Sequence, residues 1–349
     1  MDQTIAIAGR KIGASQPPYV IAEMSGNHNG EIGRALRLID AAKAAGADAV
    51  KLQTYTADTI TIDHDGPGFV LEDGLWRGRR LYELYQEAHT PWEWHPRLFE
   101  HAREVGIACF SSPFDPTAID FLESLGAPAY KVASFEIVDT PLVARMAATG
   151  KPLIVSTGLA SESDITEAMA AARAAGAREI VLLHCTSGYP TPADQMHLRT
   201  LPHLASAHGV IAGLSDHTLG TAVAVAALAL GAAVIEKHFT LARADGGPDS
   251  AFSLEPDELK RLVADCRDAW AALGQVHYGE VAAEASNRDL RRSLYVVADV
   301  AKGEPLTAAN VRSIRPGHGL PPKHLGDVIG RPAARDLKRG EPLAWDQIG

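Results

Sequence analysis

The sequence predicts a closed (β/α)8 barrel followed by a small β-rich module. Three observations support this prediction: short apolar runs alternate with helical patterns, most of the runs end in polar residues, and the alternation stops after Gly274. Eight strand and helix units in about 260 residues are the usual size of a closed barrel. A doubly wound open sheet is the weaker alternative, because it also alternates strands with helices.

The predicted strands are short apolar runs, many of them rich in β-branched and aromatic residues, as buried parallel strands are. Each run is followed by a segment long enough to form a helix before the next run begins. We therefore expect strands at residues 19–24, 49–55, 107–113, 129–134, 152–157, 180–186, 210–216 and 233–240.

The predicted helices have apolar residues three or four positions apart, which places them on one face. The first helix is expected to carry Ile32, Leu36, Ile39 and Ala42 on one face. Several helices end in glycine, which readily takes the left-handed conformation at a helix C-terminus. The expected helix stops are Gly46, Gly106, Gly126, Gly150, Gly176 and Gly231.

The C-terminal part contains a short internal repeat. After Gly274 the chain is polar and charged, as a connector is, and then DVAKGEPL at 299–306 recurs as DLKRGEPL at 336–343. Two copies are too few for a solenoid, so we interpret them as equivalent turns of one compact module. A unit this small is marginally stable alone and is expected to pack on a barrel. The predicted divisions are residues 1–280 for the barrel, 281–291 for a linker and 292–349 for the module.

The composition is that of a globular protein that binds small molecules. Of the 349 residues, 46% are hydrophobic and 22% charged, which argues against disordered and fibrous classes. The 33 basic and 43 acidic residues give a net charge of -10, which is unfavourable for a nucleic-acid surface. A local lysine cluster can still attract a small anion, so we expect small-molecule substrates and no nucleic acid.

Cysteine usage and hydropathy predict a cytoplasmic protein. Cys109, Cys185 and Cys266 are too few and too scattered for a disulfide framework, and we expect them to be small buried side chains. The N-terminal residues lack the apolar core of a signal peptide. The longest apolar run, residues 221–235, is shorter than the about 20 residues of a membrane span.

One predicted strand, with the sequence VIEKHFTL, carries Glu236, Lys237 and His238 in its middle. Buried charges need a reason, and nearly every other predicted strand also ends in polar residues. In a barrel these strand ends meet at one mouth, where active sites are built. The polar strand-end residues are Glu23, Lys51, Gln53, Ser111, Ser112, Lys131, Ser134, Ser156, His184, Thr186, Ser215, His217, Glu236 and His238.

Residues two apart in a strand point to the same side of the sheet. A polar pair at this spacing can therefore face the barrel interior while the residue between them packs outward, which makes Lys237 a structural residue. The pairs expected to face inward are Lys51 with Gln53, Ser215 with His217, and Glu236 with His238.

A set of cations and hydroxyls suits a phosphate or carboxylate, and it comes without a glycine-rich phosphate loop. Its members are Lys51, Lys131, Ser134, Ser156 and Ser215.

Two further capacities lie on the same strand ends. His217 and His238, from adjacent predicted strands, could hold a divalent cation with positions left for substrate and water, although two imidazoles are fewer than the usual three ligands. Glu23 and Glu236 are candidate acid-base groups.

A series of motifs in this order resembles the sialic acid synthase family over essentially the whole chain. The motifs are IAEMSGNHNG (21–30), KLQTYT (51–56), YKVASFE (130–136), STGLAS (156–161), HCTSGYPTP (184–192), GLSDHTLG (213–220), VIEKHFTL (234–241) and GGPDSAFSLEPDE (246–258). In the tail, RRSLYVV and IRPGHGLPP look like the family's C-terminal antifreeze-like (SAF) domain.

The resemblance implies condensation of phosphoenolpyruvate with the open-chain aldehyde of an acetamido sugar, forming a nine-carbon 2-keto acid and phosphate. Residues 81–95 and the Thr186-Ser187 pair followed by Tyr189 look like the branch whose acceptor is 2,4-diacetamido-2,4,6-trideoxy-L-altrose. Members that make N-acetylneuraminate typically carry Asn where Ser187 stands, so Ser187 matches only by position.

The resemblance also implies roles for individual residues, a manganese or magnesium ion, and a homodimer in which the SAF domain caps the barrel of the partner subunit. The phosphoenolpyruvate positions are Lys51, Lys131, Ser134, Ser156, Ser215 and Ser187. The sugar positions are Gln53, Tyr189, Glu236, Asp249 and, from the tail, Arg315. The metal positions are His217 and His238, and the acid-base or water-positioning carboxylates are Glu23, Glu136 and Glu236.

Other functions remain open at the level of sequence. The acceptor could instead be that of an N-acetylneuraminate or legionaminate synthase. A different reaction class is a Schiff-base aldolase with Lys131 as the nucleophile. A non-catalytic function, in which the tail binds carbohydrate or ice, would leave the polar strand ends unexplained.

Overall fold

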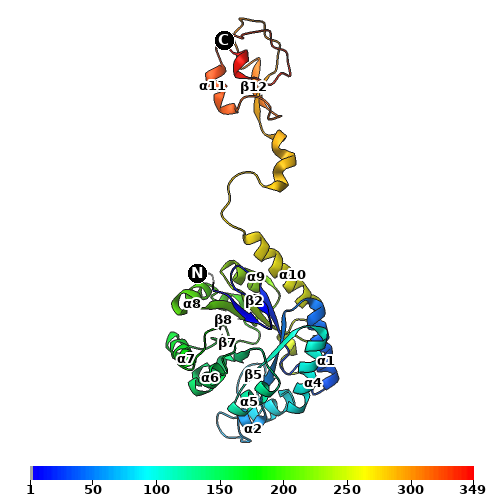
Figure 1. Cartoon of the computed structure of the whole chain (residues 1–349). Coiled ribbons are helices and arrows are strands. Elements are labelled where there is room, and N and C mark those ends of the chain that lie inside the picture. The colour runs from blue at the N-terminus through cyan, green and yellow to red at the C-terminus, as the bar shows by residue number, and fades with distance from the viewer. Residues whose placement is uncertain (1–2) are drawn as a thin grey trace. The chain divides into compact units, whose positions relative to one another are not determined.

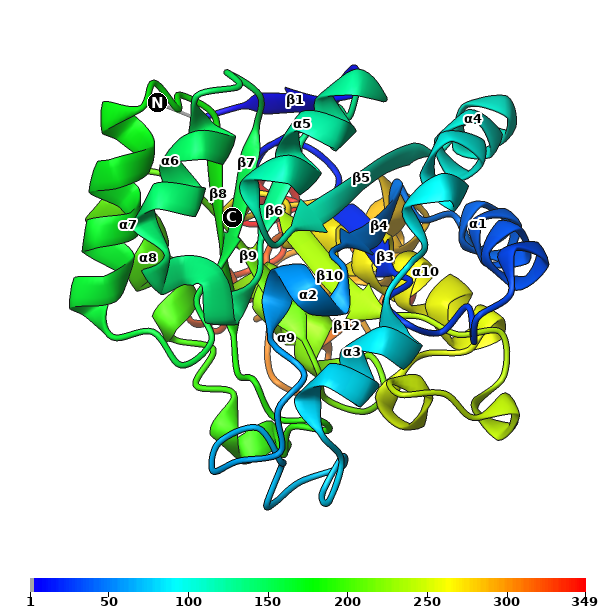
Figure 2. The same ribbon diagram turned by 90° about the horizontal axis from the view of Figure 1, so that it is seen from below.

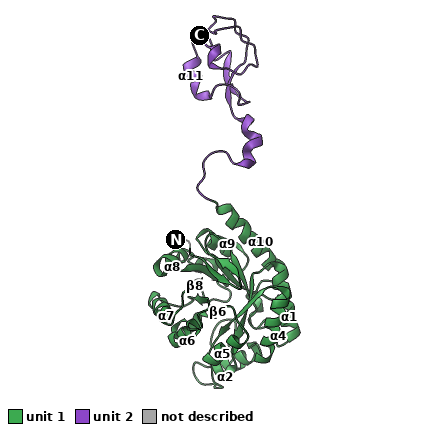
Figure 3. Ribbon diagram, in the orientation of Figure 1, with its two compact units in different colours: residues 1–274 green, residues 275–349 purple. Residues whose placement is uncertain are grey.

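The computed structural model describes residues 3–349, which form two compact units divided between Gly274 and Gln275 (Figure 3). In the first unit, the described strands β3 to β10 form a closed parallel barrel in which neighbours in sequence pair and β10 returns to β3 (Figure 1). The predicted (β/α)8 barrel is confirmed, and the open sheet is excluded. The barrel strands are β3 (Tyr19–Glu23), β4 (Ala49–Thr54), β5 (Ala108–Pro113), β6 (Tyr130–Val132), β7 (Leu153–Ser156), β8 (Ile180–Cys185), β9 (Ile211–Asp216) and β10 (Val234–His238).

The barrel core has two layers, as the alternation of side chains along each strand requires. One set of apolar residues fills the interior and includes Tyr19, Phe110 and Leu183. Neighbouring positions such as Val20 and Leu182 point outward and pack with the surrounding helices. Residue parity along each strand therefore decides which polar residues enter the barrel and which lie behind it.

Helices surround the strands on the outside of the barrel (Figure 1). Local signals set their limits: Asp115 caps the start of α5, Ser161 forms a capping box on α7, and Gly46 ends α1 with φ 86°. All six predicted helix-stop glycines have positive φ. The helices that follow the strands are α1 (Ile32–Ala45), α4 (His95–Val105), α5 (Pro116–Ser124), α6 (Thr140–Ala147), α7 (Glu162–Ala174), α8 (Thr200–His208), α9 (Ala222–Ala229) and α10 (Pro256–Leu273).

The predicted apolar face of α1 is wrong in part. Ile39 is fully buried, but Ile32 is exposed and Leu36 is only half-buried. The buried stripe runs instead through Ala35, Leu38 and Ile39 and continues to Ala42 and Ala45. Ile32 is the first residue of the helix and lies outside this buried stripe.

Two additions frame the barrel. The antiparallel pair β1 (Ile5–Ile7) and β2 (Arg10–Ile12) adds apolar residues to the interior core. Between β4 and α4 lie α2 (Ala57–Ile60), α3 (Leu81–Ala88) and a long connecting loop that reaches beyond both helices (Figure 2).

The second unit has its own small core and a short antiparallel pair, β11 (Ser293–Val296) with β12 (Val311–Ile314), near helix α11 (Leu325–Val328). The internal repeat forms reciprocal contacts. The backbone N–H of Arg339 donates to Asp299 at 2.9 Å, and the N–H of Lys302 donates to Asp336 at 2.7 Å. The two copies are therefore equivalent turns of one module, as predicted.

Across residues 3–349, none of the helices combines the length and the apolar character needed to cross a membrane.

Candidate active site

A chain of buried charges crosses the mouth of the barrel. Lys51 Nζ lies 2.7 Å from Glu23 and 3.7 Å from Glu236, and Lys131 Nζ lies 3.7 Å from Glu236 on its other side. Ser215 donates to Glu236 at 3.1 Å. Side chains from β3, β4, β6, β9 and β10 thus meet at one point, as the parity of these strands predicts.

The electrostatics of this cluster depend on burial. Burial alone would raise the pKa of Glu236, but Lys131 and Lys51 outweigh it and hold the pKa below its usual value. Burial lowers the pKa of Lys131, with Glu236 opposing the shift. For Lys51, burial is outweighed by Glu23 and Glu236, so its pKa is raised. Lys51 and Glu236 therefore remain charged, and the ammonium group of Lys51 can bind an anion.

Hydroxyl groups collect where the segments at the ends of β6, β7 and β8 meet. Ser134 accepts a hydrogen bond from the Gly158 N–H at 3.2 Å. A Cβ atom on Gly158 would lie 2.2 Å from the Ser187 hydroxyl and 2.7 Å from that of Ser134, so only glycine leaves this space open. Within the described residues, the buried Ser156 hydroxyl has no hydrogen-bond partner. This hydroxyl cradle, formed by Ser134, Ser156, Gly158 and Ser187, suits a small oxyanion.

Two carboxyl groups at the mouth have strongly shifted pKa values. Burial raises the pKa of Glu23 to about 7 against the opposing effect of Lys51, and Gln53 donates to Glu23 at 2.9 Å. Burial also raises the pKa of Glu136 to about 7, with Lys131 opposing the shift. Carboxyl groups that titrate near neutral pH suit proton transfer.

The two predicted metal-binding histidines face each other on neighbouring strand ends. The ring centroids of His217 and His238 are 5.3 Å apart. His217 Nδ1 lies 3.0 Å from the carbonyl oxygen of Thr186, which can only accept, so Nδ1 carries the proton and Nε2 has the free lone pair. Burial, and next the neighbouring His217, hold the pKa of His238 well below its usual range, which keeps this ring neutral.

These two imidazoles fit a divalent cation, but they do not form a complete cage. His238 Nδ1 is buried and has no hydrogen-bond partner in the described part of the chain, so this nitrogen is available to a ligand. The nearest carboxylate, Asp249, lies 3.9 Å from it. Residues 3–349 contain no group of three or more His, Cys, Asp or Glu that could hold a metal ion. A bound ion would therefore take further ligands from substrate or water.

An aromatic wall stands beside the histidines. Tyr189 lies with its ring centroid 4.5 Å from that of His217 and 5.1 Å from that of Phe252. Asp249, in the same segment as Phe252, accepts a hydrogen bond from Ser25. Burial raises the pKa of Asp249, with Ser25 opposing the shift. Tyr189 and Asp249 thus close the barrel mouth on the side of the two imidazoles.

The structure brings together the predicted residues of the first unit, and their roles stay predictions. Arg315 belongs to the second unit. Two polar strand-end residues expected at the mouth point away from it: Ser111 bonds Thr54 at 2.6 Å on the outer side of the sheet, and His184 bonds the Met196 carbonyl there. Residue parity alone could have excluded both, because Ser112 and Cys185 occupy the inward positions.

Sequence reasoning missed three groups in the site. Gly158 stands in a quoted motif, but only the approach of Ser134 and Ser187 shows why glycine is needed. Ser25 contacts Asp249 from a position 224 residues away, which no local pattern reveals. The thiol of Cys185 faces His217 Nδ1 at 3.9 Å, and its inward parity was the available signal.

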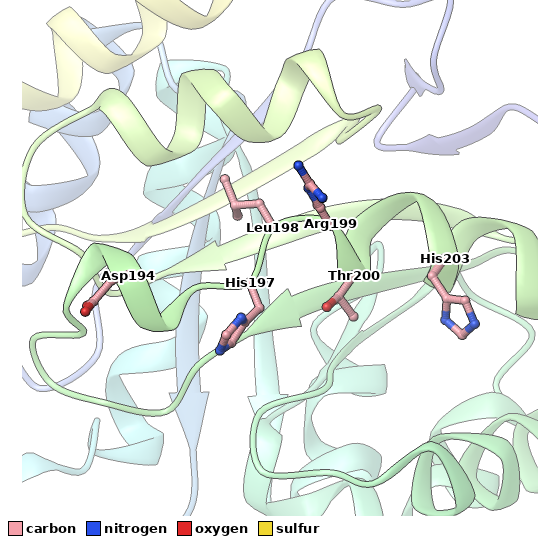
Figure 4. Close-up of a pocket in the computed structure, with 6 residues that line it drawn as sticks. All are labelled: Asp194, His197, Leu198, Arg199, Thr200 and His203. Atoms are coloured by element: carbon pink, nitrogen blue, oxygen red, sulfur yellow. The ribbon is translucent and has the colours of Figure 1, made fainter.

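A separate open hollow of about 660 Å³ lies on another part of the barrel unit (Figure 4). Its lining comes from the segment that leads into α8 and from the first turn of that helix, and it includes none of the predicted site residues. The lining residues are Asp194, His197, Leu198, Arg199, Thr200 and His203.

A barrel mouth that combines a hydroxyl cradle, buried lysines and paired imidazoles is suited to an enzyme that acts on a small anionic substrate. The chain matches the NeuB family over residues 38–278 and the SAF domain over residues 291–349. This protein belongs to the NeuB family.

Its relatives include the pseudaminic acid synthase of Campylobacter jejuni, 44% identical over 93% of this chain and 95% of the relative. The pseudaminic acid synthase of Helicobacter pylori is 42% identical over 95% of this chain and 98% of the relative. Among solved structures, the N-acetylneuraminic acid synthetase of Leptospira borgpetersenii superimposes with a TM-score of 0.73 at 31% identity, covering 82% of this chain and 95% of that one.

Proposed function

We propose that this protein is a pseudaminic acid synthase. It condenses phosphoenolpyruvate with 2,4-diacetamido-2,4,6-trideoxy-L-altrose and water to give a nine-carbon 2-keto acid and phosphate. The observation that carries the proposal is the hydroxyl cradle, which lies in the same barrel mouth as two buried lysines and two facing imidazoles. Whole-length similarity to synthases with this name supports the choice of acceptor.

The cradle and the lysines would bind phosphoenolpyruvate. Lys51 and Lys131 supply positive charge, while Ser134, Ser156, Ser187 and Ser215 supply hydrogen bonds to phosphate and carboxylate oxygens. The partner that Ser156 lacks would be one of these oxygens. Glu236, which lies 3.7 Å from both ammonium groups, keeps them at the mouth before the substrate arrives.

The sugar would lie on the histidine side, against Gln53, Tyr189 and Asp249. His217 and His238 would hold Mn²⁺ or Mg²⁺, which when bound supplies charge stabilisation for the oxygen of the acceptor aldehyde. His217 is suited to this role because its hydrogen bond through Nδ1 leaves Nε2 for a ligand. His238 is suited because its buried Nδ1 has no hydrogen-bond partner among the described residues.

Proton transfer and water placement would fall to the carboxyl groups. C3 of phosphoenolpyruvate forms a bond to the aldehyde carbon, whose oxygen gains a proton. Water adds at C2, and the adduct loses phosphate to leave the 2-keto acid. Glu23 and Glu136, with pKa values of about 7, can each give or take a proton at neutral pH, and Glu236 would act from its place between Lys51 and Lys131.

We propose further that the chain works as a homodimer. Residues 292–349, here called the SAF unit, would be joined to the barrel by residues 281–291, cap the barrel of the partner and supply Arg315. Apolar side chains are exposed on the loops after β6, β7 and β9, at the mouth end of the barrel, and they suit a covering surface. These side chains are Phe135, Val138, Leu159 and Leu219.

We propose the cytoplasm as the site of action, because phosphoenolpyruvate is made there. The three cysteines are unpaired thiols, which suits a reducing compartment.

The test is to offer phosphoenolpyruvate with a panel of acetamido sugars and to follow phosphate release and the mass of the product. Release with 2,4-diacetamido-2,4,6-trideoxy-L-altrose at a kcat/KM at least about tenfold above that of any other sugar supports the proposal. Exclusive use of N-acetylmannosamine, or of a legionaminate precursor, would replace it with the corresponding synthase.

One observation favours a second candidate, a Schiff-base aldolase. Burial lowers the pKa of Lys131, which is what an amine nucleophile requires. Borohydride treatment in the presence of pyruvate separates the two reactions, since an aldolase would be trapped covalently on Lys131. A phosphoenolpyruvate condensing enzyme would stay unmodified.

A further inference from the structure

The loop between α2 and α3 contains a well-defined hairpin, residues 69–81. Its two sides are joined by backbone hydrogen bonds from Leu71 to Arg79 at 3.0 Å and from Leu81 to Phe69 at 2.9 Å. Val70 and Arg80 add an antiparallel bridge. The N–H of Arg77 donates to the carbonyl of Gly74 at 3.3 Å, so the bend of the hairpin contains Leu75 and Trp76. The loop that includes this hairpin reaches beyond α2 and α3 (Figure 2).

Trp76 connects this hairpin to two segments that contain proposed sugar contacts. Its indole N–H donates to the carbonyl oxygen of Pro248 at 2.9 Å, directly before Asp249. Its ring centroid lies 5.5 Å from that of Tyr189, at an interplanar angle of 54°. The indole thus holds a fixed place beside both segments, whereas the neighbouring Leu75 is 48% exposed.

The aromatic wall therefore extends from Trp76 to the two imidazoles. The ring of Tyr189 contacts those of both Trp76 and His217. The ring centroid of Phe252 lies 4.9 Å from that of His238. Around the cradle, by contrast, the site is built from lysines and hydroxyls. The mouth has a polar side for an anion and an aromatic side for the apolar groups of the other substrate.

We propose that Trp76 is a specificity-determining residue for the acceptor sugar. In the complex, a methyl group of the sugar, either C6 or that of an acetamido substituent, packs against the indole. The inference rests on the proposed function. A methyl group gains from contact with an aromatic face, whereas a hydroxymethyl group there would lose water without a hydrogen bond. Discrimination of about 10-fold to 100-fold is the range that an apolar contact of this kind supplies.

The hydrogen bond to Pro248 gives Trp76 a second effect, because it fixes the backbone next to Asp249. Trp76→Phe keeps an aromatic face but removes this donor, and Trp76→Ala removes both. The two variants separate contact with the sugar from placement of Asp249. Leu75→Ala is the matched control, since it alters the same bend of the hairpin at an exposed side chain.

The experiment measures kcat and KM for each substrate in the full-length enzyme, using the 6-deoxy acceptor and its 6-hydroxy and mono-acetamido analogues. Trp76→Ala is expected to raise the KM for the 6-deoxy acceptor about 10-fold or more and to narrow its advantage over at least one analogue. The KM for phosphoenolpyruvate should stay within about twofold. Trp76→Phe should keep most of the discrimination and lower kcat, and Leu75→Ala should match the wild type.

Equal effects of Trp76→Ala on both substrates, unchanged acceptor discrimination, or the same loss in Leu75→Ala would overturn the inference. If Trp76→Ala does not fold, as judged by its thermal transition, the acceptor discrimination of Trp76→Phe decides: a partly reduced discrimination supports the contact, and a discrimination equal to that of the wild type rejects it. A wild type that releases no phosphate with any acetamido sugar rejects the proposed function, and the inference with it. An active wild type with an unaffected Trp76→Ala rejects the inference alone.

Discussion

Glu23, Lys51 and Glu236 are charged side chains that face the interior of the barrel from β3, β4 and β10. Each is buried, and each has an oppositely charged neighbour within 4 Å. Burial of an unpaired charge costs several kcal/mol, so pairing explains how the strands tolerate them. It does not explain the unpaired Ser156 hydroxyl or the space at Gly158, and both of these point to a ligand.

Gly158→Ala tests the hydroxyl cradle. The new methyl group would meet the hydroxyls of Ser134 and Ser187, which can rotate away without disturbing the barrel but then leave the anion. We expect the KM for phosphoenolpyruvate to rise about 10-fold or more, as the loss of one or two hydrogen bonds of about 1 kcal/mol each implies. Gly33→Ala is the control, because a Cβ there meets only Arg37 at 3.7 Å. Equal KM values in both variants would contradict a cradle at Gly158.

Glu136 predicts a pH dependence. Its pKa is raised from 4.5 to about 7 by burial, so the folded protein binds more protons than the unfolded chain between these values. Stability should therefore fall as the pH rises from about 4.5 to about 7, and Glu136→Gln should flatten this part of the curve. Urea unfolding at several pH values measures it. In the same variant, an ionisation near pH 7 should disappear from the kcat/KM profile, and its persistence would assign it to another group such as Glu23.

The histidine pair predicts metal dependence. Treatment with a chelator should abolish turnover, and Mn²⁺ or Mg²⁺ should restore it. His238→Ala should weaken Mn²⁺ binding, measured by electron paramagnetic resonance without substrate, at least about 10-fold, because it removes one of two proposed protein ligands. His184→Ala is the matched control, since this histidine points to the outer side of the barrel. Full activity of the metal-free enzyme would refute the site.

At the scale of elements, β9 and β10 pair in register, with Ser215 opposite Glu236 and Asp216 opposite Lys237. The first pair faces the site, and the second forms a fully buried ion pair behind it, with Nζ 2.7 Å from the carboxylate. Asp216 also accepts from the N–H and the hydroxyl of Thr218. This ion pair ties together the two strand ends that carry His217 and His238, and it confirms that Lys237 is structural.

Lys237→Met should cost about 3–5 kcal/mol of unfolding free energy, because it leaves the Asp216 carboxylate buried without a counter-charge. The double variant Asp216→Asn with Lys237→Met should recover part of this loss, since Asn keeps an acceptor for Thr218 and carries no charge. Chemical unfolding of the three proteins gives the comparison. A double variant as unstable as the single one would show that the charge balance is not what matters.

At the scale of the whole molecule, the chain consists of two units with separate cores. The barrel contains every predicted site residue except Arg315, which lies in a loop of the SAF unit between Ile314 and the following Pro316. The proposed role of Arg315 therefore requires a contact between a barrel and a SAF unit.

Complementation tests whether the SAF unit acts on a partner subunit. Arg315→Ala should lower activity about 10²-fold, as the loss of one contact to a developing charge does. His238→Ala should be inactive for a different reason. Mixed dimers of these two variants should regain activity, because one barrel remains intact and the other chain supplies an intact Arg315. Purified mixed dimers without activity, together with full turnover of a protein that ends at residue 286, would exclude the capping arrangement.

The local sequence predicted most of the fold and the side of the barrel wall on which several site residues lie. The strand positions, the helix stops at glycine and the inward placement of Lys51, Glu236 and His238 were all predicted, because strand alternation and glycine conformation depend on neighbours in the chain. The errors were local too: Ile32 and His184 have the right character but the wrong position in the helical or strand period.

Only the tertiary structure decided which groups meet. The Gly158 cradle joins loops after β6, β7 and β8, and Ser25 reaches Asp249 across 224 positions of sequence. Trp76 reaches Pro248 across 172 positions, from a hairpin whose own sequence gives no sign of a target. Such contacts depend on the closure of the barrel, which brings loop ends together in space. A local period can place a side chain on a face, but it carries no information about the distant residue that it will touch.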